Sequence, residues 1–401
     1  MKIYGKGRCF AMPYSVYLKK NEEKRILAGH SWVYANEVQR VEGKDKNGSL
    51  AAVYAADGRF VGKGYINHAS KILVRLFLRG EEEDGKPFYL RRLRECAEYR
   101  RKLGHGYDNC CRLVFAEADG LPGLIVDKYG DYMVMQCLSL GIHQRKKMIA
   151  ECLAELFAPK GIYERSDAAV RAKEGLPPEK GVLCGEVPDE VIIEENGLKM
   201  SVDVKNGQKT GYFLDQKENR FAVRRYCAGG EVLDCFCNSG GFSLNAAAAA
   251  KNVTAADISP AALENVRKNC ALNGIENVTT VCADVFELLR TYKKEGKKFD
   301  VVVLDPPAFC KSVAEVKDAC RGYKDINILG MKLVRPGGFL VTCSCSHYMT
   351  APLFEKMLAE AAAQSGRRAR AAEIRSQAPD HPALLGEDET RYLKFFVLQI
   401  L

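Results

Sequence analysis

Residues 231–241 read Glu-Val-Leu-Asp-Cys-Phe-Cys-Asn-Ser-Gly-Gly, and this stretch decides the fold. An apolar strand is predicted at 232–234, and a helix at 241–250. The glycines between them allow a tight turn and a close approach of the backbone to a ligand. This order of strand, glycine loop and helix is typical of a nucleotide-cofactor site in an α/β sheet. The cofactor-binding candidates in it are Asp234, Asn238, Ser239 and Gly240.

The sequence that follows alternates between predicted strands and helices. Further strands are predicted at 253–257, 278–282, 299–304, 339–342 and 392–401, and further helices at 260–273, 285–292, 324–333 and 352–363. The strands are nearly continuous apolar runs, as buried parallel strands are. The predicted fold class is therefore α/β, a doubly wound, Rossmann-like sheet.

Four aspartates fall at or just past the ends of predicted strands. They are Asp234, Asp257, Asp284 and Asp305. In an open α/β sheet the ligand binds beyond these strand ends. Asp257 follows Asp234 by 23 residues, close to the usual offset of an acid that accepts from a ribose hydroxyl. Asp284 is predicted to lie near the adenine amine, and Ile258 and Val285, which follow two of the acids, are further cofactor-binding candidates. For any single aspartate, a helix cap is the ordinary alternative.

The glycine loop alone leaves a NAD-type dinucleotide fold as a rival. However, Asn-Ser-Gly-Gly is not the G-x-G-x-x-G fingerprint of such folds. A dinucleotide site would also leave the stretch Asp305-Pro-Pro-Ala-Phe309 unexplained. Its two prolines fix the backbone and suit a site that holds a planar base against one carboxyl group. Asp305 is thus a catalytic candidate, and Pro306, Pro307 and Phe309 are substrate-binding candidates. The alternative is a rigid exit from the strand.

The stretch Thr342-Cys-Ser-Cys-Ser346 contains a candidate nucleophile, Cys345. Methylating a pyrimidine at C5 is difficult because that carbon is barely nucleophilic. A thiolate that adds to C6 makes C5 reactive toward a methyl donor, and elimination later frees the thiol. Asp305 could hydrogen-bond N3 and the amino group of cytosine during the addition. Cys343 competes with Cys345 for the role of nucleophile.

Charge is distributed unevenly along the 401 residues, a length that predicts two or three domains. Residues 1–80 hold 15 Lys and Arg against 6 Asp and Glu, so they carry the whole net charge of +9. This basic module reads as short strands at 53–55, 60–66 and 72–77. It is predicted to bind a phosphate backbone, with a solvated cationic surface as the alternative.

The sequence contains no run of roughly 18 apolar residues, and residues 1–10 lack the apolar core of a signal peptide. We expect a soluble, cytoplasmic protein without membrane contact. The 16 cysteines are spread along the chain, which fits a reducing compartment. No metal site is expected, because the C-x-C pairs lack the spacing and the histidines of a zinc site.

Several further motifs carry a family resemblance over residues 11–401. They include Gly29-His-Ser-Trp-Val-Tyr34, Glu117-Ala-Asp-Gly-Leu-Pro-Gly-Leu-Ile-Val-Asp127, Lys209-Thr-Gly-Tyr-Phe-Leu-Asp-Gln216, Arg321-Gly-Tyr-Lys-Asp325 and Ser344-Cys-Ser346. With these motifs the chain resembles the bacterial large-subunit rRNA cytosine-C5 methyltransferases that carry an N-terminal PUA domain. The resemblance implies a PUA domain over 1–80, a central α+β domain over 81–195 and an S-adenosylmethionine-dependent methyltransferase domain over 196–401.

The resemblance also implies roles for individual residues. Cys345 would be the nucleophile and Asp305 the acid that contacts the base. The segment 209–220 would cover the cofactor, lined by Tyr212, Phe213, Asp215, Gln216 and Arg220. Trp32 and Lys63 are RNA-binding candidates, although Trp32 suits the core of its domain equally well. The implied partner is large-subunit ribosomal RNA, and a homodimer is possible.

One departure from related enzymes concerns the residue after the paired prolines. A different branch of RNA cytosine methyltransferases has a second cysteine there, whereas this chain has Ala308. A one-cysteine mechanism is expected. The alternatives are N-methylation of guanine or adenine, which needs no thiol, and C5 methylation of uracil, which shares the thiol chemistry. An RNA-binding or assembly factor with a silent cofactor pocket is the alternative outside enzymes.

Overall fold

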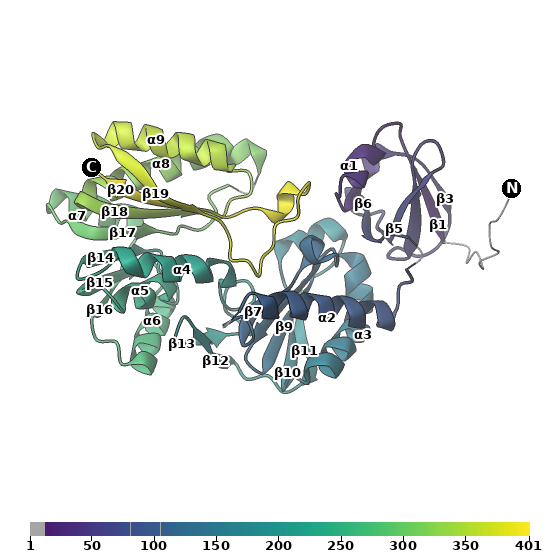
Figure 1. Cartoon of the computed structure of the whole chain (residues 1–401), viewed down its shortest axis with the longest axis horizontal. Helices are drawn as coiled ribbons and strands as arrows, with labels where there is room; N and C mark the ends of the chain where they lie inside the picture. Colours follow the sequence, from purple (N-terminus) through teal and green to yellow (C-terminus); the bar gives the residue numbers. More distant parts are fainter. Residues whose placement is uncertain (1–12, 81, 105, 311) are drawn as a thin grey trace. The chain divides into compact units, whose positions relative to one another are not determined.

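Figure 1 presents the protein as a computed structural model that describes residues 13–80, 82–104, 106–310 and 312–401. The chain forms two compact units. The first contains the described residues up to Lys102, Arg112–Val187 and Leu384–Glu387, and the second contains Leu103–Cys111, Pro188–Ala383 and Asp388–Leu401. The domain boundaries expected at 80 and 195 divide the chain differently and stay a prediction. The signal-peptide argument concerned residues 1–10, which lie outside the described residues.

The first unit begins with a six-stranded sheet in the order β2-β6-β5-β4-β1-β3. Its elements are β1 (Tyr14–Leu18), α1 (Glu23–Leu27), β2 (Trp32–Tyr34), β3 (Val38–Gly43), β4 (Leu50–Tyr54), β5 (Phe60–Ile66) and β6 (Ile72–Leu78). The predicted strands near 53, 60 and 72 are confirmed. Gly64 is required where β5 meets β6, because a Cβ there would lie 2.1 Å from the Arg75 carbonyl oxygen.

A second sheet of the first unit has five strands in the order β11-β10-β9-β8-β7, and helices α2 and α3 pack against each other beside it. The elements are α2 (Lys86–Lys102), β7 (Cys110–Phe115), β8 (Leu124–Tyr129), β9 (Tyr132–Cys137), α3 (Leu140–Phe157), β10 (Gly161–Ser166) and β11 (Glu179–Gly185). The sequence predicts helices at 89–103 and at 146–157 in this region, and both are present. Helix α3 starts at Leu140, six residues before the predicted start.

The second unit contains the predicted doubly wound sheet, with seven strands in the order β16-β15-β14-β17-β18-β20-β19. A hairpin of β12 (Glu190–Glu195) and β13 (Leu198–Asp203) precedes it. The strands are β14 (Glu231–Cys235), β15 (Asn252–Asp257), β16 (Val278–Cys282), β17 (Phe299–Leu304), β18 (Val334–Ser344), β19 (Ala369–Arg375) and β20 (Lys394–Ile400). The strands β16, β15, β14, β17 and β18 are parallel to one another. Strand β20 pairs antiparallel with β18, and β19 pairs antiparallel with β20.

Six helices of the second unit flank this sheet. They are α4 (Lys217–Val223), α5 (Gly241–Ala247), α6 (Pro260–Asn273), α7 (Val285–Lys294), α8 (Val316–Leu333) and α9 (Ala351–Ser365). Figure 1 shows α8 and α9 on one side of the sheet and α4, α5 and α6 on the other. From β14 the chain continues to β15 and β16 on one side of β14. It later returns to β17, which lies on the other side of β14. Such a reversal of strand order opens a crevice at the carboxyl ends of the strands.

Successive side chains of the central strands point to opposite faces of the sheet, and they form the core of the second unit. In β17, Val302 and Leu304 pack with Phe354 of α9, whereas Val301 and Val303 pack with Phe242 of α5. All four strand residues are fully buried. Burying each such side chain contributes about 1.5–3 kcal/mol, so the central strands form a rigid base for the loops at their ends.

Two predicted elements of the second unit begin five or more residues away from their predicted start. Helix α8 begins at Val316 rather than at 324, and Gly322 lies inside it, where a Cβ would meet the Phe309 ring at 3.3 Å. Strand β18 already begins at Val334, so the segment Pro336-Gly337-Gly338 lies within the strand instead of before it. The pairing with β17 shifts register there, which accommodates the proline.

Candidate active site

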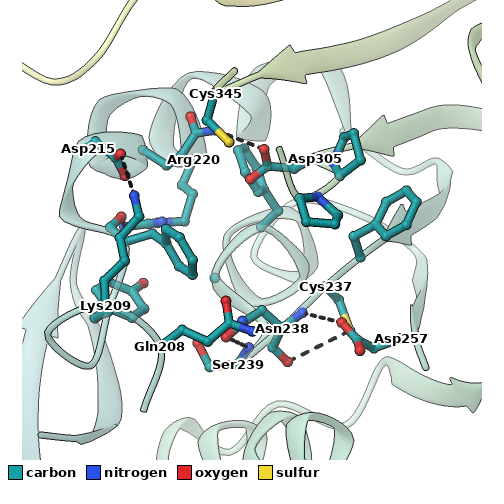
Figure 2. Close-up of a pocket in the computed structure, with 18 of the residues that line it drawn as sticks. Gln208, Lys209, Asp215, Arg220, Cys237, Asn238, Ser239, Asp257, Asp305 and Cys345 are labelled. Atoms are coloured by element: carbon teal, nitrogen blue, oxygen red, sulfur yellow. Dashed lines mark hydrogen bonds and ion pairs between the residues drawn. The ribbon is translucent and has the colours of Figure 1, made fainter. Parts of the chain in front are cut away.

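A cavity of about 280 Å³ lies in the second unit beyond the carboxyl ends of β14, β15, β17 and β18. Thirteen of the residues predicted for the site line it. These are Tyr212, Phe213, Asp215, Gln216, Arg220, Asn238, Ser239, Asp257, Ile258, Asp305, Pro306, Pro307 and Cys345. Figure 2 shows Asp257 and Asn238 on one side of this cavity and Asp305 and Cys345 on the opposite side. The cavity therefore has room for a ligand between a carboxylate and a thiol.

The loop between β14 and α5 presents its backbone to the cavity. Phe236, Asn238 and Gly240 all have positive φ angles, of 62°, 49° and 85°. Such angles are strained for residues other than glycine, and they cluster at functional sites. Gly241 is required as well, because a Cβ there would lie 2.7 Å from Cδ of Arg220. The loop can thus approach a ligand closely, as the glycines predicted.

Asp257 ends β15 and is held by backbone donors. Its Oδ2 accepts from the Asn238 N–H at 3.0 Å, and its Oδ1 accepts from the Ser259 N–H at 2.9 Å. A carboxylate oxygen has a second acceptor site, and this side chain lines the cavity. Asp257 can therefore accept hydrogen bonds from a diol.

Asp234 is fully buried in β14, beneath the glycine loop. Its Oδ2 accepts from the Ser243 hydroxyl at 2.5 Å, whereas its Oδ1 has no partner among the described residues. The pKa of Asp234 is raised to about 7, chiefly by burial; the hydrogen bond from Ser243 opposes this rise, and the nearby Asp305 and Asp257 add to it. A buried acceptor without a partner is costly, so a donor on a bound ligand would fit this position.

Asp305 follows β17 and faces the segment that covers the cavity. Gln216 Nε2 donates to its Oδ1 at 3.2 Å. Burial raises the pKa of Asp305 to about 6; Asp215 adds to this shift, and Arg220 and Lys209 oppose it. A carboxyl group with this pKa can act near neutral pH either as a proton donor or as an acceptor.

The segment 209–220 is fixed by one buried and one partly exposed ion pair. Arg220 binds Glu195 of β12 through two hydrogen bonds of 2.6 and 2.7 Å, and the Tyr212 hydroxyl donates to the same carboxylate at 3.1 Å. Closer to the opening, Lys209 binds Asp215 at 3.2 Å and has a positive φ of 53°. Figure 2 shows Lys209 reaching up to Asp215 along one side of the cavity.

Cys345 lies in the loop after β18, and its two serine neighbours anchor this loop. Ser344 Oγ donates to the Tyr323 hydroxyl at 3.0 Å, and the same hydroxyl lies 3.0 Å from Ser346 Oγ. Burial raises the pKa of the Cys345 thiol, and the charge of Lys209 opposes that rise. Cys343, the other candidate nucleophile, is fully buried and does not line the cavity.

The comparisons with known proteins agree with this architecture. Residues 16–79 match the PUA-like domain family, and residues 177–386 match the S-adenosylmethionine-dependent methyltransferase family. A protein of Aeromonas salmonicida named ribosomal RNA large subunit methyltransferase I is 45% identical over 394 residues, which are 96% of this chain and 98% of the relative. A protein of Vibrio cholerae with the same name is 42% identical, covering 96% and 99% of the two chains.

This chain belongs to the S-adenosylmethionine-dependent methyltransferase family. Solved structures support the fold. A SAM-dependent methyltransferase from Streptococcus mutans superposes with a TM-score of 0.82 at 20% identity, covering 96% of this chain and 99% of the other. A methyltransferase complexed with SAH has a TM-score of 0.84 at the same identity and coverage. The predicted fold class, enzyme class and cofactor, S-adenosylmethionine, are confirmed.

Some residues predicted for the methyltransferase site do not line the cavity. Gly240 shapes the loop beside it, and Asp284 accepts from the Glu287 N–H as the N-cap of α7. Val285 is buried in the core, and the Phe309 ring packs on that of Tyr323, with centroids 4.6 Å apart. Their roles toward cofactor or substrate stay predictions.

The two RNA-binding candidates belong to the first unit. The Trp32 indole donates to Glu117 at 2.8 Å, and the guanidinium of Arg75 lies over its ring. The Lys63 ammonium donates to the Glu82 carbonyl oxygen at 2.6 Å. Both side chains have partners within their own unit. Their contact with RNA stays a prediction.

Sequence reasoning missed several residues of the methyltransferase cavity. They are Gln208, Phe236, Cys237, Gly241, Phe242, Ser259 and Leu393. Most are neighbours of predicted residues, so wider windows around the motifs would have found them. Leu393 gave no signal, because it comes from the antiparallel strand region more than 40 residues after Cys345.

The described residues contain one group with the spacing of a metal site, His143, Glu164 and Glu179 of the first unit. Lys146 donates to both carboxylates, at 2.9 Å in the case of Glu164. The Lys146 ammonium, together with the Arg171 guanidinium 3.6 Å from Glu179, thus already balances the two carboxylates of this cluster. No described helix is both long and apolar enough to cross a membrane.

Proposed function

We propose that the chain methylates C5 of a cytosine in large-subunit ribosomal RNA through a covalent bond between Cys345 and C6 of the base. The relatives that match almost the whole chain are named ribosomal RNA large subunit methyltransferase I. The observation that carries the chemistry is the position of Cys345 on the same side of the cavity as Asp305, in a cavity that the two prolines also line. Methylation of C5 needs a thiol at this position, whereas methylation of a ring or amino nitrogen does not.

In this proposal the glycine-loop side of the cavity holds the cofactor. The carboxylate of Asp257 accepts from the ribose hydroxyls, and the backbone of Asn238 and Ser239 lies against the amino-acid moiety. The unpartnered Oδ1 of Asp234 accepts from the ammonium group, directly or through a water molecule. The segment 209–220 covers the cofactor from the other side.

The base lies between Pro306 and Cys345. The Cys345 thiolate forms a bond to C6, and the electron pair of the C5–C6 double bond moves through C4 to N3. The protonated carboxyl group of Asp305 gives its proton to N3, and its other oxygen accepts from the amino group of cytosine. The pKa of about 6 makes Asp305 a suitable donor near neutral pH.

When bound, S-adenosylmethionine supplies the methyl group to C5, and its sulfur keeps the electron pair of the broken bond. Asp305 takes the N3 proton back, which returns the electron pair toward C5. A base removes the C5 proton, the C5–C6 double bond forms again, and the carbon–sulfur bond to Cys345 breaks, with its electron pair staying on sulfur. Overall, one hydrogen of the base is replaced by a methyl group, and one proton is released.

The PUA-like domain and the basic charge of residues 1–80 support an RNA partner. In the proposal this module binds the sugar–phosphate backbone by charge and shape. The target base must be flipped out or already single-stranded to enter the cavity. A cytoplasmic location and a homodimer are further expectations.

The test uses rRNA that contains 5-fluorocytosine, because fluorine at C5 blocks the final elimination. The wild-type enzyme, Cys345→Ala and Cys343→Ala are incubated with this RNA and S-adenosylmethionine, and adducts are separated on a denaturing gel. We expect adducts with the wild type and Cys343→Ala and none with Cys345→Ala.

Other outcomes would contradict the proposal in distinct ways. An adduct that survives in Cys345→Ala but not in Cys343→Ala would move the nucleophile to Cys343. Methyl transfer to ordinary rRNA without any adduct would favour N-methylation of a purine. An adduct on 5-fluorouracil rRNA alone would identify uracil as the target, and failure to bind S-adenosylmethionine would favour an assembly factor.

A further inference from the structure

A buried lysine lies directly behind the Cys345 loop. Lys394 begins β20 and pairs with Ser344 of β18 across the sheet. Its side chain is only 7% exposed, and its ammonium donates to the carbonyl oxygens of Ser346 and Tyr392, both at 2.6 Å. No carboxylate of the described residues forms an ion pair with this ammonium. Burying an ammonium group without a counter-charge is unfavourable, so its retention here needs an explanation.

The electrostatic surroundings of Lys394 point to Cys345. Burial lowers the pKa of Lys394 to about 8, so that the group is still mostly protonated at neutral pH. Of the described residues, only Cys345 opposes that shift, which means that a negative charge on the thiol favours the ammonium form. The missing counter-charge can thus be the thiolate itself.

Several other titratable groups face Cys345. Burial raises the pKa of the thiol most. Lys209 and, more weakly, Lys394 lower it, whereas Asp305 and Asp215 raise it. Lys209, however, is paired with Asp215 at 3.2 Å, and its side chain is 42% exposed. Its charge is therefore largely compensated and screened. Tyr323 and Cys343 also lie close, but neither can supply a positive charge. Lys394 is the buried and uncompensated cation of this group.

We propose that the Lys394 ammonium stabilises the thiolate of Cys345 and so acts as a positioning residue for the nucleophile. When the thiol ionises, the electron pair of the S–H bond stays on sulfur and the proton passes to solvent. Lys394 keeps its own proton throughout, and its hydrogen bond to Ser346 holds the loop so that charge and sulfur stay close. The inference rests on the proposed covalent function of Cys345.

The simplest rival explanation is that Lys394 only ties the loop to β20. Two substitutions separate the explanations. Lys394→Gln keeps an N–H donor for a carbonyl oxygen but removes the charge, and Lys394→Met removes both. Lys251→Gln, at an exposed lysine paired with Glu231, serves as the matched control.

The experiment measures alkylation of Cys345 by iodoacetamide as a function of pH, read by mass spectrometry of its peptide. It needs neither RNA nor cofactor, and the exposed Cys282 in the same sample is an internal reference. In both uncharged variants, the midpoint of the Cys345 profile should move up by about one pH unit, which slows alkylation at neutral pH about tenfold. The Cys282 profile and the Lys251→Gln variant should be unchanged.

A wild-type profile in Lys394→Gln would overturn the inference and leave Lys394 as a structural tie. Thermal unfolding and S-adenosylmethionine binding report whether the variants fold. If neither uncharged variant folds, Lys394→Arg decides, because it keeps the charge. A shift of the midpoint by a full unit in this variant overturns the inference, because the charge is still present there. A shifted profile without any fluorocytosine adduct would sink the covalent function but keep the pairing of lysine and thiol.

Discussion

Gln216 donates a hydrogen bond from Nε2 to Oδ1 of Asp305 at 3.2 Å, which ties the segment covering the cavity to the Asp-Pro-Pro loop. The orientation of the Gln216 amide is fixed in turn, because its Oε1 accepts from Nδ2 of Asn219 at 2.7 Å. The amide can therefore only present its N–H groups to Asp305. The carboxyl group proposed to contact the base is thus held by the segment 209–220, which lines the cavity.

Removing this bond should change the pH dependence of methylation. The hydrogen bond from Gln216 lowers the pKa of Asp305, so Gln216→Leu should raise that pKa further. Because the proposal uses the protonated carboxyl group, the alkaline limb of the pH–rate profile should move to higher pH, while the maximal rate falls about tenfold through lost orientation. Gln208→Leu, in the same cavity but without this bond, is the control. An alkaline limb that moves to lower pH would contradict the assignment of Asp305 as the proton donor.

Asp234 should make the fold less stable as the pH rises. Burial raises its pKa from 3.8 to about 7, so the unfolded chain loses this proton first, and the free energy of unfolding falls as the pH rises from about 4 to 7. Asp234→Asn has no carboxyl group to titrate at this position, so its free energy of unfolding does not fall in this way. At pH 8 the variant should be about 1–3 kcal/mol more stable than the wild type, with a much smaller difference at pH 5.

Urea unfolding of both proteins at the two pH values checks this expectation. Cofactor affinity should fall in the same variant, because the amide offers a poorer acceptor for an ammonium group. Equal differences in stability at pH 5 and pH 8 would show that Asp234 is not the titrating group.

Asp257 and Asp284 both follow strands, but the structure gives them different partners. Asp257→Ala should weaken S-adenosylmethionine binding about tenfold or more, since its carboxylate lines the cavity. Asp284→Ala should instead cost about 1 kcal/mol of stability by removing the cap of α7. Calorimetric titration and thermal unfolding of both variants separate the two roles. A loss of affinity in Asp284→Ala with unchanged stability would support its predicted contact with adenine.

The Tyr323 hydroxyl joins the two serines on either side of Cys345. Tyr323→Phe removes both bonds, so the thiol should be oriented less well, and the maximal rate of methylation should fall about tenfold. The stability loss should be about 1–2 kcal/mol, and cofactor affinity should not change. Single-turnover methylation measures the effect, with Tyr348→Phe in the exposed part of the same loop as control. An unchanged rate would mean that the loop is held without this hydroxyl.

The central sheet could be predicted from the sequence because each buried parallel strand is an apolar run that ends in a polar residue. β14, β15 and β17 follow this rule, and their ends carry Asp234, Asp257 and Asp305. The edge strand β19 could not be predicted in the same way. Most of its residues are exposed or half-buried, and its sequence, Ala-Arg-Ala-Ala-Glu-Ile-Arg, has no apolar run.

The candidate site was predictable where neighbours in sequence carry the chemistry, and not where distant residues meet. Nothing in the sequence near Asp215 indicates that Tyr392, 177 residues later, donates to it. Lys394 carried no signal either, because a lysine at the start of an apolar strand is normally a solvated end. Only its pairing with Ser344 of β18 brings it behind the nucleophile.

The acidic side chains around the cavity have a consequence for turnover. Asp305 and Asp257 raise the pKa of Asp234, and Asp215 raises that of Asp305, so these carboxyl groups repel one another. A cationic ligand relieves this repulsion. The sulfonium of S-adenosylmethionine is such a cation, whereas the thioether left after methyl transfer is neutral. The cofactor and its spent form have nearly the same shape, so the protein can distinguish them by charge and release the one that has already reacted.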